Sequence, residues 1–182
     1  EMEFAEYIGI KHAVGVGSGT DALYLALKAC GVGYGDEVIT VSHTAVATVA
    51  AIELTGATSI LVDIEPEFYT INPSQIQKAI TPSTKAIIPV QLCGCAVEME
   101  EVWEIAKEFN LAVVEDTAQG LFSKYNGTYM GTQSEIGCFS MAVSKLVSTG
   151  QGGFTVTRDK ELYEQMKLIR THGVANVNAA TP

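Results

Sequence analysis

Lys145 lies in a long run of neutral residues, and the presence of a charged amine there needs a physical explanation. Between Glu135 and Arg158 it is the only charged side chain. Lysine stems often lie over apolar surface while the amine reaches water, and a lone lysine in an apolar stretch fits that ordinary description. A lysine withdrawn from water instead loses its proton more readily and becomes an amine nucleophile that can form a Schiff base. Other parts of the chain must decide between the two.

A second group of residues is suited to holding an anion. The segment VGVGSGTDAL has Gly15, Gly17 and Gly19 after a β-rich run, and Ser18, Gly19 and Thr20 open a helical pattern. Amide and hydroxyl donors at a helix N-terminus form a natural phosphate cradle. A purely structural glycine turn is an equal alternative. The pattern is also similar to a dinucleotide-binding fingerprint, but the acidic residue expected at the end of the next strand is missing.

The third candidate is a carboxylate at the end of a buried strand. Residues 111–116 read LAVVED, so apolar residues lead directly into Glu115 and Asp116. A buried carboxylate needs a cationic or hydrogen-bond-donating partner, and an isolated one is most simply a helix cap or half of a salt bridge. Pyridoxal 5'-phosphate needs all three features together. Its phosphate is held by a helix N-terminus, its ring nitrogen by a carboxylate and its aldehyde by a lysine.

Alternating strands and helices must position these residues. Expected strands cover 12–17, 36–42, 58–64, 85–92, 111–116, 136–141 and 152–157, and expected helices cover 20–30, 45–56, 72–80, 98–110 and 159–173. The Asn-Gly pair in 125–131 predicts a hairpin. This alternation predicts a three-layer α/β/α fold with a mostly parallel sheet. Such sheets bind ligands at the carboxyl ends of their strands, where all three candidates lie.

Composition narrows the class of protein. The chain has 182 residues, 47% hydrophobic and 18% charged, with a net charge of −10. The negative charge speaks against nucleic acid as a partner, and there is no membrane-spanning or signal-peptide pattern. The four cysteines show neither a C-x-x-C pair nor metal-ligand spacing, so we expect reduced thiols, no metal and a cytoplasmic location. Both ends look cut, which predicts one incomplete domain over 1–182.

The motifs taken jointly resemble a known family. VGVGSGTDALYLALKACGVGYGDEVITVSHT, VEDTAQG, GCFSMAVSK, STGQGG and RTHG occur in the order and spacing of the DegT/DnrJ/EryC1/StrS sugar aminotransferases. These are fold-type-I enzymes that use pyridoxal 5'-phosphate to make amino sugars from nucleotide-linked keto sugars. The resemblance covers essentially the whole chain. It implies that residues 1–182 form most of the large cofactor-binding domain, and that the small C-terminal domain is absent.

The resemblance also implies roles for individual residues. Lys145 would form the Schiff base with the cofactor, and Asp116 would hold its pyridine nitrogen. Gln119 would face the phenolic oxygen, while His43 would stack on the ring. The donors to the phosphate would be Gly19, Thr20 and Ser140, next to Ser18. The candidate catalytic residues are therefore Lys145 and Asp116, and the candidate cofactor-binding residues are Ser18, Gly19, Thr20, His43, Asp116, Gln119, Ser140 and Lys145.

The implied reaction transfers an amino group, with glutamate as the donor, to a nucleotide-linked keto sugar in polysaccharide or natural-product biosynthesis. A homodimer with shared active sites is expected by the same analogy. Three departures from the family pattern, the segment SMAVSK, Gln91 and Gln151, are expected near the sugar. Two alternatives stay open: a non-catalytic regulatory protein with the same fold, and a dinucleotide-dependent oxidoreductase. The second would leave Lys145 and Asp116 without a use.

Overall fold

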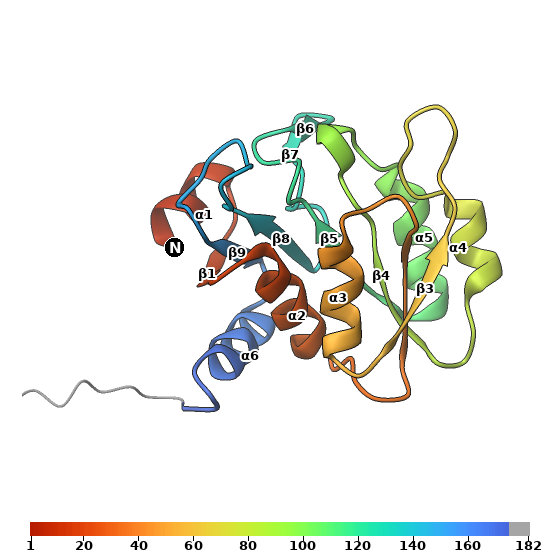
Figure 1. Cartoon of the computed structure of the whole chain (residues 1–182), viewed down its shortest axis with the longest axis horizontal. Coiled ribbons are helices and arrows are strands. Elements are labelled where there is room, and N and C mark those ends of the chain that lie inside the picture. Colours follow the sequence, from red (N-terminus) through yellow and green to blue (C-terminus); the bar gives the residue numbers. More distant parts are fainter. Residues whose placement is uncertain (175–182) are drawn as a thin grey trace, which may run out of the picture.

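A seven-stranded sheet forms the centre of the molecule in the computed structural model, which describes residues 1–174 (Figure 1). Its strands are β1 (His12–Val16), β2 (Glu37–Val41), β3 (Thr58–Val62), β4 (Thr84–Ile88), β5 (Ala112–Asp116), β8 (Ile136–Ser140) and β9 (Gly153–Thr157). The spatial order is β1-β9-β8-β5-β4-β2-β3. Pairing is parallel from β3 to β8 and antiparallel on both sides of β9. Most of the strands therefore end at the same edge.

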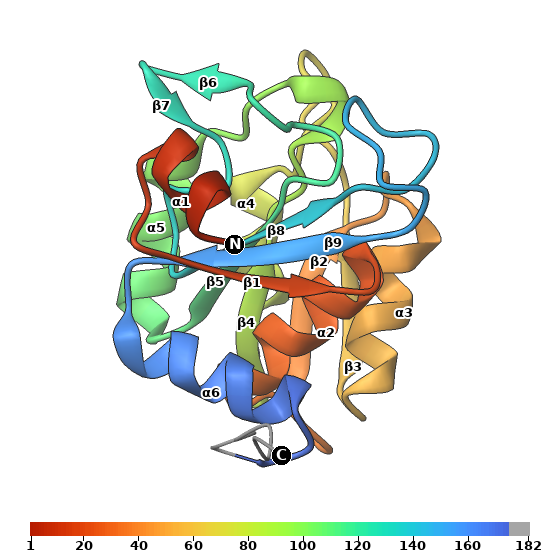
Figure 2. The same ribbon diagram turned by 90° about the vertical axis from the view of Figure 1, so that its left-hand side faces the viewer.

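Helices cover both faces of this sheet. They are α1 (Met2–Ile8), α2 (Gly19–Ala29), α3 (Val46–Leu54), α4 (Pro73–Ala79), α5 (Met99–Phe109) and α6 (Lys160–Arg170), with a short 3-10 turn, η1 (Leu92–Gly94). Helices α2, α3 and α6 pack together on one face, and α4 and α5 lie on the other. Figure 2 shows α1 and α6 on opposite sides of the edge strand β1. The predicted three-layer α/β/α fold with a mostly parallel sheet is confirmed.

Local sequence explains where the helices form. In α2 the buried residues Ala22, Leu23, Ala26 and Leu27 recur at helical spacing and face the sheet. Helix α4 begins at Pro73, and the Asn72 side chain accepts a hydrogen bond from the Ser74 N–H. Helix α6 begins in the same way, because Asp159 caps its first turn. Capping and periodicity thus mark where these helices begin and which face they bury, and packing against the sheet stabilises them.

A second, aromatic core closes the β1 edge of the sheet. Phe139 of β8 and Phe154 of β9 stack with ring centroids 4.7 Å apart, and Phe4 of α1 lies 3.9 Å from Phe154. Ala5 and Ile8 of α1 are buried in the same cluster. Helix α1 thus covers the face of β8 and β9 that α2 does not reach.

Most expected elements form, with differences at their ends. The Asn-Gly hairpin is confirmed as β6 (Lys124–Tyr125) and β7 (Thr128–Tyr129), with Asn126 and Gly127 both at positive φ. Strand β4 ends at Ile88, short of the expected 85–92, because Pro89 has no N–H for the ladder. The last helix ends at Arg170 instead of 173.

Two further expectations concern the limits of the chain. Between residues 1 and 174 no helix combines the length and the apolar character that crossing a bilayer requires. The domain expected over 1–182 runs beyond the described residues, and its incompleteness stays a prediction.

Candidate functional site

The carboxyl ends of β1, β5 and β8 meet at one cavity of about 270 Å³. Ligand pockets are commonly about 300–1,000 Å³, so this cavity suits one small molecule. It brings together these sequence-predicted residues: Ser18, Gly19, Thr20, Asp116, Gln119, Ser140 and Lys145. It does not include His43, which is exposed and lies edge-on to Tyr69 with ring centroids 6.4 Å apart. The stacking role of His43 stays a prediction.

The first turn of α2 forms one wall of the cavity. Ser18 caps the helix: its Oγ accepts a hydrogen bond from the Asp21 N–H at 3.0 Å and donates to Asp21 Oδ2 at 2.9 Å. The Ser18 hydroxyl is therefore engaged within the cap. The N–H groups of Gly19 and Thr20 belong to the helical positions that have no carbonyl partner within the helix, so they can bind an anion.

Gly19 lets α2 approach β8 closely. A Cβ atom at this position would lie 2.7 Å from the Cβ and 3.2 Å from the Oγ of Ser140. Such distances are too short for carbon and oxygen atoms that are not bonded. The absence of a side chain at Gly19 therefore allows the Ser140 hydroxyl and the start of α2 to face the same space.

Asp116 is a buried carboxylate at the floor of the cavity. Its Oδ2 accepts a hydrogen bond from the Thr48 hydroxyl at 2.8 Å, and its Oδ1 accepts one from the Ala118 N–H at 3.1 Å. Burial raises the pKa of Asp116 above its usual range, while these two donors and the charge of Lys145 lower it. A cationic N–H group in the cavity would complete the environment of this carboxylate.

Thr48 and Thr44 were missed by the sequence analysis. Thr44 lines the cavity, and its Oγ1 lies 2.7 Å from Thr48 Oγ1, one helical turn further on in α3. Thr44 could have been found from the sequence, because it follows the end of β2, where functional residues are expected. The contact between Thr48 and Asp116 could not be found in this way, since it depends on how α3 packs over β5.

Lys145 lies in a turn after β8, where its N–H donates to the Ala142 carbonyl. Its side chain is half-buried, and the neighbouring Val143 and Leu146 are strongly exposed. A second hollow of about 370 Å³ adjoins the first and shares Gln119 and Lys145 with it. Lys145 therefore lines two adjoining cavities.

Gln119 is oriented by the loop that follows β4. Its Oε1 accepts a hydrogen bond from the Cys93 N–H at 3.1 Å. Cys93 has a positive φ of 52°, which turns this N–H toward the glutamine. The amide nitrogen of Gln119 is left as a donor, as a contact with an anionic oxygen requires.

Glu115 does not face the cavity and instead fastens the neighbouring loops. Its carboxylate accepts hydrogen bonds from the N–H groups of Gly131 and Gln133, the Ser134 hydroxyl and the Gln91 amide, at 2.7–3.0 Å. Burial raises the pKa of Glu115, but all four partners act as donors and match the ionised form. Gln91 is fully buried, whereas Gln151 lines the cavity. The expected position of both residues near the sugar stays a prediction.

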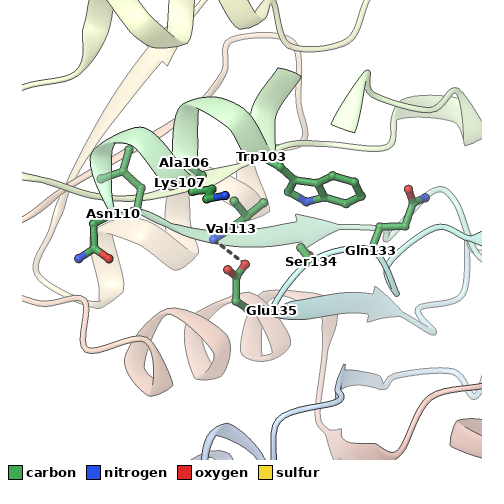
Figure 3. A pocket seen from close by; sticks show the side chains of 9 residues that line it. Trp103, Ala106, Lys107, Asn110, Val113, Gln133, Ser134 and Glu135 are labelled. Atoms are coloured by element: carbon green, nitrogen blue, oxygen red, sulfur yellow. Dashed lines mark hydrogen bonds between the residues drawn. The ribbon is translucent and has the colours of Figure 1, made fainter. Parts of the chain in front are cut away.

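A larger hollow of about 640 Å³ lies elsewhere, at the amino ends of β5 and β8. Figure 3 shows Trp103 and Lys107 on α5 above β5, and the Glu135 carboxylate accepting a hydrogen bond from the Val113 N–H. Ligands of parallel sheets bind at the opposite edge. Size alone therefore does not make this hollow the functional site.

Comparison with known proteins decides the family. The model of the DegT/DnrJ/EryC1/StrS aminotransferase family matches residues 1–181. The chain belongs to this family. Its members are aminotransferases that depend on pyridoxal phosphate.

Three similar proteins illustrate the match. The UDP-N-acetyl-3-dehydro-alpha-D-glucosamine 3-aminotransferase of Acidithiobacillus ferrooxidans is 45% identical over 95% of this chain and 47% of its own length. The pleiotropic regulatory protein of Geobacillus stearothermophilus is 44% identical over 95% of this chain and 47% of its own length. The crystal structure of S. venezuelae DesV in complex with a ketimine intermediate superposes with a TM-score of 0.94 at 41% identity, covering 100% of this chain and 49% of that one. The chain spans about half the length of these relatives.

The residues at the cavity fit the cofactor of the DegT/DnrJ/EryC1/StrS family. The N–H groups at the start of α2 and the Ser140 hydroxyl can all donate hydrogen bonds, which suits a phosphate. Asp116 offers a carboxylate whose hydrogen-bonded partners are neutral, which suits a protonated pyridine nitrogen. Lys145 supplies the amine beside them. The larger hollow beside α5 has no helix N-terminus among its lining residues and does not combine these three groups.

Proposed function

We propose that the full-length protein is a pyridoxal-phosphate-dependent aminotransferase that transfers an amino group, with glutamate as the donor, to a nucleotide-linked keto sugar. One observation carries the proposal: Lys145, Asp116 and the first turn of α2 line a single cavity in a chain of this family. The name of the A. ferrooxidans relative, an aminotransferase of a UDP-linked sugar, supports the substrate class. A cytoplasmic homodimer in a polysaccharide or natural-product pathway completes the proposal.

Each residue has a task in this reaction. The N–H groups of Gly19 and Thr20, with the Ser140 hydroxyl, bind the phosphate and fix the position of the ring. The Asp116 carboxylate would accept a hydrogen bond from the ring nitrogen and favour its protonated form. When bound, the cofactor supplies an aldehyde that receives the amino group and a ring that withdraws electrons from the reacting carbon.

Lys145 acts as nucleophile and then as general base. Its unprotonated Nζ would hold the cofactor through the aldehyde. The same Nζ, when free, would take the proton from the substrate carbon that carries the nitrogen. The adjoining hollow, which also reaches Lys145, offers the substrate a path to this amine.

Replacing Lys145 by alanine tests the proposal. In the full-length protein, Lys145→Ala should lose the visible absorbance of the lysine-bound cofactor and reduce amine transfer by at least about 100-fold, a typical cost of removing a proton-transferring side chain. Lys107→Ala is the matched control, because Lys107 is the lysine of the larger hollow in Figure 3. The control should keep both properties, and a Lys145→Ala protein that kept both would refute the assignment.

A regulatory role is the second candidate, and the name of the G. stearothermophilus relative favours it. Wild-type protein that bound the cofactor but transferred no amine from glutamate to any of a panel of nucleotide-linked keto sugars would support that candidate. The presence of Lys145 and Asp116 at one cavity supports catalysis instead.

A further inference from the structure

Two threonine hydroxyls connect the cavity to the buried carboxylate of Asp116. Thr44 Oγ1 lies 2.7 Å from Thr48 Oγ1, and Thr48 Oγ1 lies 2.8 Å from Asp116 Oδ2. Thr44 is half-buried at the cavity, whereas Thr48 is fully buried. The three side chains come from the loop after β2, from α3 and from the end of β5. They form a chain of hydrogen bonds between two layers of the fold.

The charge of Asp116 determines which hydroxyl donates and which accepts in each of these hydrogen bonds. An ionised carboxylate only accepts hydrogen bonds, so the single proton of the Thr48 hydroxyl must point to Asp116. Thr48 can then only accept from Thr44, and the Thr44 proton must point to Thr48. A protonated Asp116 would allow the opposite direction. The distances between the three oxygens allow the donating direction that an ionised Asp116 requires.

Other threonines of the fold use their hydroxyls differently. Thr55, at the end of the same helix, donates back to the carbonyl of Ile52, as threonines in helices commonly do. The buried hydroxyl of Thr155 has no hydrogen-bond partner within the described residues. Thr48 instead bonds to a side chain 68 positions away in the sequence.

We propose that Thr48 is a positioning residue for Asp116, holding the carboxylate ionised and turned toward the cavity, and that Thr44 keeps the Thr48 hydroxyl in its donating orientation. This inference rests on the proposed function, since it assigns Asp116 to the cofactor nitrogen. Thr48 touches neither cofactor nor substrate and acts only through Asp116.

A double-mutant cycle on cofactor binding tests the proposal in the full-length protein. Thr48→Val removes the hydroxyl and keeps the shape of the side chain, and it should weaken the affinity for pyridoxal 5'-phosphate about tenfold or more, since hydrogen bonds to charged groups are the strong ones. Thr48→Ser should restore the affinity to within about threefold of wild type. Thr44→Val should have an intermediate effect. Thr55→Val is the control and should not change the affinity.

The second arm of the cycle repeats Thr48→Val in an Asp116→Asn background. If Thr48 acts through the charge of Asp116, most of its effect should vanish there. An equal loss of affinity in both backgrounds would show a merely structural role and overturn the proposal. A Thr48→Val protein with the cofactor affinity of wild type would overturn the proposal as well. Wild-type protein with no affinity for the cofactor would instead refute the proposed function, so the two failures are distinguishable.

Discussion

At the scale of single residues, the site contains charged groups whose burial costs folding stability. Asp116 is buried without a hydrogen-bonded cation, and its raised pKa reflects the cost of removing a charge from water. Lys145 sits half-buried beside it, in a segment with no other charge. Such costs are characteristic of functional sites, where stability is given up for binding.

Replacing Asp116 by asparagine should therefore separate stability from binding. A carboxyl with a raised pKa in the folded state contributes stability that is present at low pH and lost as pH rises through that pKa. Without cofactor, Asp116→Asn should thus be more stable than wild type at pH 7–8, and the difference should shrink as the buffer is made acidic. Each kcal/mol corresponds to roughly 2–4 °C in Tm for a chain of this size. Calorimetry across pH measures the difference, and a less stable mutant at neutral pH would contradict it.

Cofactor affinity should show the opposite dependence on pH. Wild-type affinity should fall as pH drops through the raised pKa of Asp116, since protonation removes the acceptor for the ring nitrogen. The Asp116→Asn variant should bind the cofactor weakly at every pH and should not show this fall in affinity.

Sequence reasoning succeeded for residues whose position follows from one strand. Asp116 and Ser140 each end a strand, so the rule for parallel sheets places them at the same edge. It did not find Thr48, whose hydrogen bond to Asp116 joins distant segments, or the hydrogen bond between Gln91 and Glu115. Residue type and local pattern carry no information about such packing.

At the scale of elements, the approach of α2 to β8 determines the shape of the cavity. This approach depends on Gly19, as the space at its Cα is filled by Ser140. The alternating pattern of strands and helices predicted that α2 follows β1 directly. It could not predict which strand α2 would touch, because the sheet order places β9 and β8 beside β1.

Adding one methyl group at Gly19 should disturb this contact. Gly19→Ala should destabilise the protein by about 1–3 kcal/mol, the usual cost of overpacking, and weaken cofactor binding because the phosphate donors move. Gly33→Ala is a suitable control, since the nearest atom to its new Cβ is the mobile end of Lys28 at 3.8 Å. Urea unfolding and cofactor titration measure both effects. Equal behaviour of the two variants would show that α2 tolerates displacement from β8.

At the scale of the whole molecule, the net charge of −10 repels the anionic ligands that the protein is proposed to bind. The electrostatic attraction for these ligands must therefore be local to the site. Helix N-termini and neutral hydroxyls provide it without a basic surface. The fold class was predictable because short apolar strands alternate with helical segments along the chain. The larger hollow beside α5 was not predictable, since its walls come from segments with no shared pattern.

Borohydride reduction followed by peptide mapping of the full-length protein incubated with pyridoxal 5'-phosphate tests the central claim most directly. Reduction makes the bond between the cofactor and its lysine permanent. The account predicts one major modified peptide, carrying the cofactor on Lys145, and its loss in Lys145→Ala. A modification centred on another lysine, or no modification at all, would contradict it.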